Sequence, residues 1–188
     1  MDINDRIAAR VRRIRAERGL SLEALAESSG VSRSMISLIE RGQSSATAVV
    51  LEKLATGLGV PLASLFDAPV TPAEPVSRRE DQVEWRDPAS GYVRRNVSPP
   101  GFPSPIQIVE VVFPAGARVA YETGPRPGVM HQQIWVLQGT LEVTLDGTRH
   151  ELGAGDCLAM VVDRQITFRN RTARPVRYAV IIDHQPHG

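Results

Sequence analysis

The 188-residue chain has little that would suit it to a membrane or to an oxidising compartment. It contains a single cysteine, Cys157, so no disulfide can form within the chain. No apolar run approaches the roughly 20 residues that a membrane-spanning helix needs. The segment from Met1 to Arg18 is charged throughout and lacks the apolar core of a secretory signal. We therefore expect a cytoplasmic protein without a membrane partner.

Two other scarcities carry less weight. Lys53 is the only lysine among 22 basic residues, which we attribute to genome composition rather than to mechanism. The net charge is only +1, so the overall balance does not indicate a nucleic-acid partner. Six arginines between Arg6 and Arg18 either contact phosphate or form a solvated helix face. Cys157 precedes an apolar run and is expected to be a buried, inert side chain.

The most informative stretch runs from Leu20 to Gly42 and predicts two short helices joined by a tight turn. Apolar residues recur at helical spacing in its first half. Gly30 can then take the positive φ that a sharp turn needs. Ser32 is a suitable N-cap for the second helix, whose inner face is Ile36 and Ile39.

The outer face of that second helix is small, polar and cationic. Such a face can enter the major groove of DNA, where a bulky or acidic one could not. We expect Arg33 to read guanine, Arg41 to lie nearer the backbone, and Ser32 to cap the helix while touching phosphate. The predicted DNA-binding residues are Ser32, Arg33, Ser34, Ser37 and Arg41.

The sequence SLEALAESSGVSRSMISLIERG, residues 21–42, resembles the helix-turn-helix of the phage-repressor-like Cro/C1 regulators, also called the XRE family. The resemblance extends over residues 4–66, where Leu65 and Phe66 match the closing motif. It implies an all-α bundle of five helices that binds DNA. It also implies that Arg15 pairs with Glu40 and so ties the first helix to the recognition helix. The alternative is a bundle that serves only as a scaffold or an oligomerisation domain.

Composition changes after Phe66. The segment 67–80 has three prolines and no apolar periodicity, so it predicts an extended linker between two domains. Arg78 and Arg79 lie within it, and either they contact DNA phosphate or they are solvated charges, which is the simpler interpretation.

From Asp81 onward the hydrophobic period changes to two, as in β-strands. Turn signals separate the runs, and Asp146-Gly147 strongly indicates a two-residue hairpin. Many short strands without crossover helices favour a β-sandwich or barrel. The predicted strands are Ile106–Phe113, Gln133–Leu137, Leu141–Leu145, Leu158–Val162, Ile166–Phe168 and Val176–Ile182.

The sequence IWVLQGTLEVTLDGTRHELGAGD, residues 134–156, resembles the motifs of the cupin barrel. Gly139, Gly155 and Asn170 stand at positions that the family's motifs occupy. The resemblance implies an all-β double-stranded β-helix. The expected fold is therefore two domains: a helix-turn-helix domain over residues 1–66, a linker over 67–80, and a cupin-like effector and dimerisation domain over 81–188.

Metal-binding cupins carry three histidines and a glutamate, and this sequence replaces all four. The resemblance puts the glutamate position at Gln132 and the third histidine position at Ile166. The first two histidine positions fall within 125–128, which contains no histidine. An amide is a poor metal ligand and isoleucine is none, and His131 is one position out of register. We expect no metal, no other cofactor and no catalytic residue.

A barrel without a metal still has a cavity, and ligand sites are mostly apolar with a few polar groups. Alternation places Gln132, Ile134 and Val136 on one strand face, and Ile166 and Phe168 lie on a strand that faces it. Arg126 stands where the lost histidines would be and is suited to clamp a carboxylate or phosphate. The alternative is a barrel filled by side chains. The predicted effector-binding residues are Tyr121, Arg126, Gln132, Met160 and Ile166, and the opposite strand face, His131, Gln133 and Trp135, is a candidate for packing another subunit.

Two functions from different classes fit these features. The first is a homodimeric repressor that binds an inverted-repeat operator in double-stranded DNA and responds to a small-molecule effector. The second is a metal-dependent cupin enzyme, an oxygenase or isomerase, tethered to a DNA-binding module. The missing ligand set favours the regulator. The resemblance implies effectors such as amino acids, polyamines or sulfur compounds, and a barrel kept only for dimerisation stays open.

Overall fold

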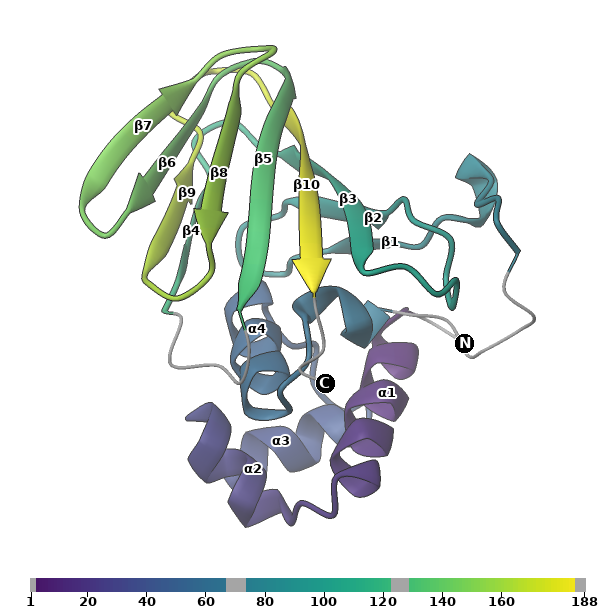
Figure 1. The fold of residues 1–188 in the computed structure, drawn as a ribbon. Helices are drawn as coiled ribbons and strands as arrows, with labels where there is room; N and C mark the ends of the chain where they lie inside the picture. The colour runs from purple at the N-terminus through teal and green to yellow at the C-terminus, as the bar shows by residue number, and fades with distance from the viewer. Residues whose placement is uncertain (1–2, 67–73, 123–128, 185–188) are drawn as a thin grey trace.

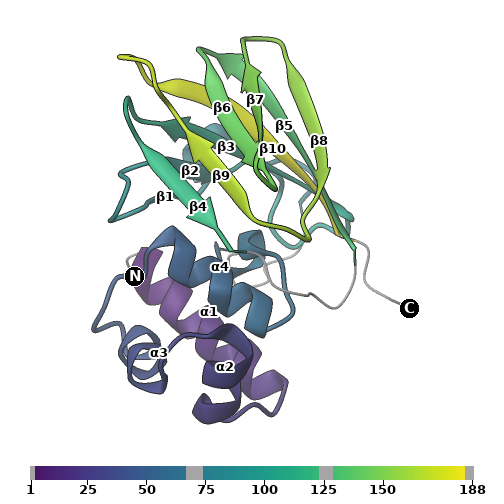
Figure 2. The same ribbon diagram turned by 90° about the vertical axis from the view of Figure 1, so that its left-hand side faces the viewer.

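The computed structural model describes residues 3–66, 74–122 and 129–184, and it consists of a helical region beneath a β-rich region (Figures 1 and 2). The helical region buries one apolar face of each helix in a common core, which includes Val11, Leu25, Ile36 and Leu54. Its elements are α1 (Ile3–Glu17), α2 (Leu22–Ser29), α3 (Arg33–Glu40), α4 (Ala48–Gly57) and the 3-10 helix η1 (Leu62–Phe66).

The expectation of five α-helices is wrong. Between residues 3 and 66 the structure has four, and the fifth segment is the 3-10 helix Leu62–Phe66. This segment is too short for a cooperative α-helix. Its 3-10 geometry repeats every three residues, so Leu62 and Leu65 both point into the core and are buried.

The turn between α2 and α3 forms as the sequence predicts. Gly30 adopts a left-handed conformation, with φ 67°, at the end of α2. Ser21 and Ser32 cap the two helices, because their side-chain oxygens accept hydrogen bonds from the backbone N–H of Ala24 and Met35. These caps fix where each helix begins, and they set the angle at which α3 leaves the turn.

Helices α2 and α4 pack closely at Gly57. A Cβ atom on Gly57 would lie 2.7 Å from Cβ and 2.9 Å from the backbone nitrogen of Ser29. Ser29 is buried and its hydroxyl donates to the carbonyl oxygen of Leu25 at 2.6 Å, so it cannot easily move aside. Glycine is therefore required here by the space between the helices.

The β-rich region contains two antiparallel sheets. One has six strands in the order β1-β2-β3-β10-β5-β8, and the other has four in the order β4-β9-β6-β7. The apolar side chains between the sheets are buried and continue the apolar cluster of the helical region. The strands are β1 (Glu84–Arg86), β2 (Val93–Asn96), β3 (Ile106–Phe113), β4 (Arg118–Tyr121), β5 (Met130–Gln138), β6 (Leu141–Leu145), β7 (Thr148–Leu152), β8 (Cys157–Val161), β9 (Ile166–Arg169) and β10 (Val176–His184).

The six predicted strands are confirmed to within a few residues, and so is the hairpin at Asp146-Gly147. Both turn residues have positive φ, 46° and 81°, which matches the right-handed twist of the flanking strands. Of the other four strands, β7 is the second arm of the predicted hairpin, and the short strands β1, β2 and β4 were not predicted. β1 and β2 are rich in charged residues, and the buried Arg95 of β2 pairs with Glu110 of β3 at 2.8 Å and with Glu84 of β1 at 3.7 Å.

The expectation of a buried Cys157 is wrong, since its side chain is exposed. Cys157 pairs with Trp135 in the ladder between β8 and β5, and both side chains point away from the core. Its thiol lies 3.7 Å from the side-chain oxygen of Gln133. Side chains alternate between the two faces of a strand, and Cys157 is on the outward face of β8. A short apolar run does not show which face each of its residues takes.

Two residues of the cupin-like motifs hold the barrel together. Gly139 has φ 86°, and a Cβ atom there would lie 3.3 Å from the carbonyl oxygen of Pro175. Asn170 is fully buried, and its amide donates to the carbonyl oxygens of Phe113, Pro114 and Arg174. These residues keep the barrel's shape, whatever its interior holds.

The helical and β-rich regions are in direct contact (Figures 1 and 2). The backbone N–H of Ala48, at the start of α4, donates to the buried carboxylate of Asp87 at 2.9 Å. The Phe66 ring packs on Trp85 with 5.3 Å between centroids, and the Arg94 guanidinium lies 4.8 Å above Phe66. Part of the segment expected to be an extended linker, Arg79–Asp81, forms a short 3-10 helix, η2.

No helix in the described part of the chain combines the length and the apolar character that crossing a membrane requires.

Replacing Gly57 with alanine should destabilise the protein by about 1–3 kcal/mol, because the added methyl group overpacks the α2–α4 contact. This loss should appear although alanine is the better helix former by about 1 kcal/mol. Urea unfolding followed by circular dichroism measures the change. The control is Glu27→Ala, an exposed position on α2, which should shift stability by no more than about 0.5 kcal/mol. A Gly57→Ala variant as stable as the parent would contradict the close packing.

Candidate nucleic-acid interface and ligand cavity

The exposed face of α3 begins at its N-cap. Ser32, Arg33 and Ser34 are exposed, and the hydroxyls of Ser32 and Ser34 lie 3.2 Å apart. The Arg33 guanidinium forms an ion pair with Glu23 of α2 at 2.5 Å. Both side chains are about two-thirds exposed, so the pair costs little to open. Arg33 can therefore exchange this carboxylate for another acceptor.

The end of the same face is organised around Arg41. Its guanidinium donates to the Ser37 hydroxyl at 2.8 Å and to the side-chain oxygen of Gln43 at 2.9 Å. Arg41 thus lies along the last turn of α3 rather than extending away from it. The five residues predicted to bind DNA share one surface, with Ser37 half-buried between the others.

Two residues at this surface were missed from the sequence. Met35 is 37 % exposed on α3, and the Ser44 hydroxyl lies 3.9 Å from its sulfur. Glu23 was missed because it lies on the preceding helix and reaches Arg33 only through the turn. A backbone hydrogen bond and the charge of Arg33 lower the pKa of Glu23, so this carboxylate stays charged at neutral pH.

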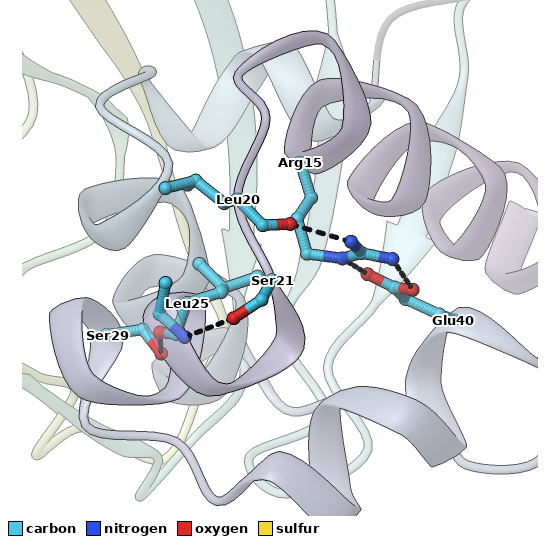
Figure 3. Close-up of polar contacts among 7 residues, drawn as sticks. Arg15, Leu20, Ser21, Leu25, Ser29 and Glu40 are labelled. Atoms are coloured by element: carbon cyan, nitrogen blue, oxygen red, sulfur yellow. Dashed lines mark hydrogen bonds and ion pairs between the residues drawn. The ribbon is translucent and has the colours of Figure 1, made fainter.

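The recognition helix is anchored to α1 by Arg15 and Glu40 (Figure 3). The guanidinium Nε and Nη2 of Arg15 donate to the two carboxylate oxygens of Glu40 at 2.6 and 2.8 Å. Its Nη1 donates to the carbonyl oxygen of Leu20 at 2.8 Å. The hydrogen bond to Glu40 raises the pKa of Arg15. This bidentate geometry fixes the end of α3 relative to α1 and to the loop before α2.

The interior of the β-rich region contains a cavity of about 70 Å³. Tyr121, Gln132 and Ile166 line it, whereas Met160 is buried outside the lining that the described residues form. Arg126 lies outside the described residues. The lining comprises Glu52, Leu62, Tyr92, Arg94, Val111, Tyr121, Met130, Gln132, Val162, Ile166, Phe168, Tyr178, Val180 and Ile182.

The cavity is apolar with a few polar groups that converge on it. The hydroxyls of Tyr92 and Tyr121 lie 3.1 Å apart. Burial raises the pKa of Tyr121 and of Tyr178 well above the usual value, so both hydroxyls stay neutral. Such hydroxyls can donate or accept hydrogen bonds, and they suit a ligand with a polar group on an apolar body.

The residues at the cupin metal position do not fit a metal. The Gln132 amide lies 3.7 Å from the Met130 sulfur, and Ile166 offers no donor atom. Within residues 3–66, 74–122 and 129–184, no cluster of three or more His, Cys, Asp or Glu side chains could hold a metal ion. An amide, a thioether and tyrosine hydroxyls make a poor donor set for a transition metal.

Eleven of the fourteen lining residues that the structure describes were not among the predicted effector contacts, and five of them show why. Arg94 lies on β2, a strand too short and charged to be predicted, and Tyr92 directly precedes that strand. Tyr178 lies inside a predicted strand, and its alternation with Val176 and Val180 was a usable signal. The last two, Glu52 and Leu62, come from the helical region, and nothing local in the sequence connects them with a barrel.

The comparisons with known proteins agree with both halves of this architecture. The helix-turn-helix family matches residues 11–65, and the cupin domain family matches residues 110–182. The HTH-type transcriptional regulator PuuR of Escherichia coli is 30 % identical over 184 residues, with 94 % of this chain and 93 % of PuuR covered. This chain belongs to the HTH-type transcriptional regulators with a cupin domain. It is a DNA-binding regulator of transcription.

Two further members of the family resemble this regulator over nearly its whole length. SutR of Escherichia coli, also an HTH-type transcriptional regulator, is 28 % identical over 182 residues, which cover 97 % of this chain and 96 % of SutR. The crystal structure of an HTH_3 family transcriptional regulator from Vibrio cholerae superimposes with a TM-score of 0.80. It shares 25 % identity and covers 98 % of both chains. The order of the two domains is therefore the same in these regulators.

Removing the Glu40 carboxylate should destabilise the regulator by about 3–5 kcal/mol, because the Arg15 charge loses its buried partner. The side chains of Arg15 and Glu40 are only 17 % and 7 % exposed. Chemical denaturation of Glu40→Ala measures the loss. The control is Glu17→Ala, which breaks an exposed pair with Arg13 and should cost at most about 1 kcal/mol. Equal stability of the two variants would contradict a structural role for the pair.

Proposed function

We propose that this regulator is a dimeric repressor that binds an inverted-repeat operator and leaves it when a small organic effector occupies the barrel. The observation that carries the proposal is that one chain combines an exposed cationic helix face, Ser32 to Arg41, with a cavity whose described lining has no cluster of metal-binding side chains. The proposal divides the chain into a DNA-binding domain, 1–66, a connecting segment, 67–80, and a sensor domain, 81–188. The DNA partner implies a cytoplasmic location.

The base-reading role falls to the start of α3. In a helix-turn-helix the recognition helix lies in the major groove, and its N-terminal residues contact base edges. Arg33 is the longest cationic side chain there, and a bidentate arginine prefers guanine. Ser34 and Ser37 contact neighbouring bases, and Arg41 and the Ser32 cap contact phosphate.

The dimer surface in this proposal is the outer face of the six-stranded sheet. Ile108, Val112 and Trp135 are exposed there, at 38, 38 and 48 %. These side chains lie on β3 and β5, on the two sides of β10, and exposed apolar side chains on one sheet face favour burial against a partner. A second copy related by two-fold symmetry would cover the same face and place two recognition helices on two half-sites. Half-site centres then lie roughly 34–36 Å apart, or a multiple of that.

The effector site in this proposal is the barrel cavity, with Tyr121, Gln132 and Ile166 among its contacts. Arg126 is proposed as an anion clamp at the same site, and Met160 as a contact through the adjoining wall. The enzyme alternative requires a metal at Gln132 and Ile166, and the donor set there is unsuited to one. The proposal therefore assigns no catalytic residue.

Replacing Arg33 with alanine should remove the base preference at one position of each half-site, a loss of about 1–3 kcal/mol of discrimination. Selection of binding sites from a random DNA library measures the preference of parent and variant. The control is Glu23→Ala, which removes the ion-pair partner of Arg33 and should leave the selected sequence unchanged. If Arg33→Ala selects the same bases at every position as the parent, this assignment is wrong.

Replacing Trp135 with glutamate should convert the dimer to a monomer, because the charge would be desolvated in the proposed interface. Light scattering at micromolar protein concentration measures the mass. The control is Thr148→Glu, an exposed position on β7 of the other sheet, which should leave the mass unchanged. A monomeric parent protein, or a dimeric Trp135→Glu variant, would contradict the proposed surface.

A further inference from the structure

The barrel cavity is lined by residues of both domains. Twelve of its lining residues belong to the β-rich region, but Glu52 lies on α4 and Leu62 on η1. Figures 1 and 2 show α4 directly beneath the end of the barrel that β4 and β5 share. A molecule in the cavity therefore faces the DNA-binding domain on one side.

The space that the cavity encloses is too small for a typical metabolite. The cavity is partly open, and its volume is about 70 Å³, less than half that of a cavity of about 150 Å³ that binds benzene. Ligand pockets for organic molecules usually measure about 300–1,000 Å³. A ligand with more than a few non-hydrogen atoms must therefore enlarge the cavity by moving one of its walls.

The strand walls are the harder ones to move. Val111 and Val180, for example, are held in continuous hydrogen-bonded ladders between β2, β3, β10 and β5. The helical wall is not held by such ladders. Its contacts include the hydrogen bond from Ala48 to Asp87, the packing of Phe66 on Trp85, and an ion pair at 3.8 Å between Lys53 and the exposed Glu122.

The contacts that hold the helical wall are continuous with the cavity lining. Arg94 lines the cavity and also lies over Phe66, the last residue of η1. Seven of the nine aromatic side chains, all of them in the described residues, form one chain of ring contacts. It runs from Phe66 through Trp85, Tyr92, Phe113, Tyr178 and Phe168 to Tyr121. Four of these rings also line the cavity.

We propose that the DNA-binding domain is the lid of the barrel cavity and that the Asp87–Ala48 hydrogen bond is its latch. The effector contacts Glu52 and Leu62 directly, and it binds with the lid displaced from its docked position. The inference rests on the proposed function, because it supplies the step between effector binding and the DNA-binding domain. The ligand is an organic molecule with an apolar body and a polar group that reaches the hydroxyls of Tyr92 and Tyr121.

The lid explains how a ligand bound in the barrel changes the position of the DNA-binding domain. A ligand shifts an equilibrium only by its difference in affinity for the two states. The docked state encloses only about 70 Å³, so a metabolite-sized ligand binds more tightly when the wall is displaced and the cavity is larger. Couplings of this kind amount to about 5- to 150-fold in an equilibrium constant.

The test uses a side chain in place of the unidentified ligand. Val180→Phe extends a larger side chain into the cavity. Thr148→Phe is the control, because it adds a phenyl ring at an exposed position of β7, away from the cavity and from the proposed dimer surface. Both are made in the full chain with Trp135→Phe, which leaves Trp85 at the domain contact as the only tryptophan. Undocking is measured as hydrogen exchange of the Ala48 amide and as the emission maximum of Trp85.

Val180→Phe should accelerate exchange at Ala48 by about 5- to 150-fold and shift the Trp85 emission to the red, while Thr148→Phe changes neither. A folded Val180→Phe variant with parental exchange and emission would overturn the lid. Neither measurement involves DNA or an effector. A wrong lid is therefore distinguished from a wrong repressor assignment, which the Arg33→Ala selection tests by itself.

A second variant keeps the test decisive if Val180→Phe does not fold. Asp87→Ala removes the latch without changing the cavity lining. It should increase exchange at Ala48 and also expose Tyr121 to nitration by tetranitromethane, mapped by mass spectrometry. If Ala48 exchanges faster but Tyr121 nitrates at the parental rate, the helical domain does not cover the cavity and the inference is wrong.

Discussion

The arrangement of the two domains depends on one buried carboxylate at the start of a helix. Asp87 accepts a hydrogen bond from the first N–H of α4 and also from the backbone and hydroxyl of Ser90. A negative charge is favourable at a helix N-terminus, where N–H groups lack partners within the helix. Burying Asp87 without those donors would be costly. The loop from Asp87 to Ser90 and helix α4 therefore hold each other in place.

Helix α4 connects the domain contact at Asp87 with both the recognition helix and the barrel cavity. On one side it packs against α2 at Gly57, and α2 leads through the capped turn into the recognition helix. On the other side it contributes Glu52 to the wall of the barrel cavity. The recognition helix is fixed from its far end by Arg15 and Glu40. Packed helices move as rigid elements, so a displacement at the barrel reaches the DNA-binding face without a change in secondary structure.

The barrel keeps the structural glycine and asparagine of the cupin motifs, although it lacks their metal ligands. Gly139 and Asn170 satisfy backbone constraints that any barrel of this kind has, so they are needed whether or not a metal is bound. The metal ligands have no such structural duty. Here the interior carries Gln132 and Ile166 instead, surrounded by tyrosine and phenylalanine rings. The result is a cavity whose lining suits an organic molecule better than a metal ion.

The sequence by itself determined the features that depend on neighbouring residues. Caps such as Ser32, the turn at Gly30 and the Asp146-Gly147 hairpin follow from local hydrogen bonding and allowed φ values, and the strand faces follow from alternation. Only the tertiary structure decided that Leu62–Phe66 is a 3-10 helix and that Cys157 faces outward. Only the tertiary structure shows that Ala48 is hydrogen-bonded to Asp87, 39 residues away, and that the helical domain forms part of the cavity wall. The physical reason is that these features depend on contacts between distant segments, and a local pattern carries no information about which distant segment will supply the contact.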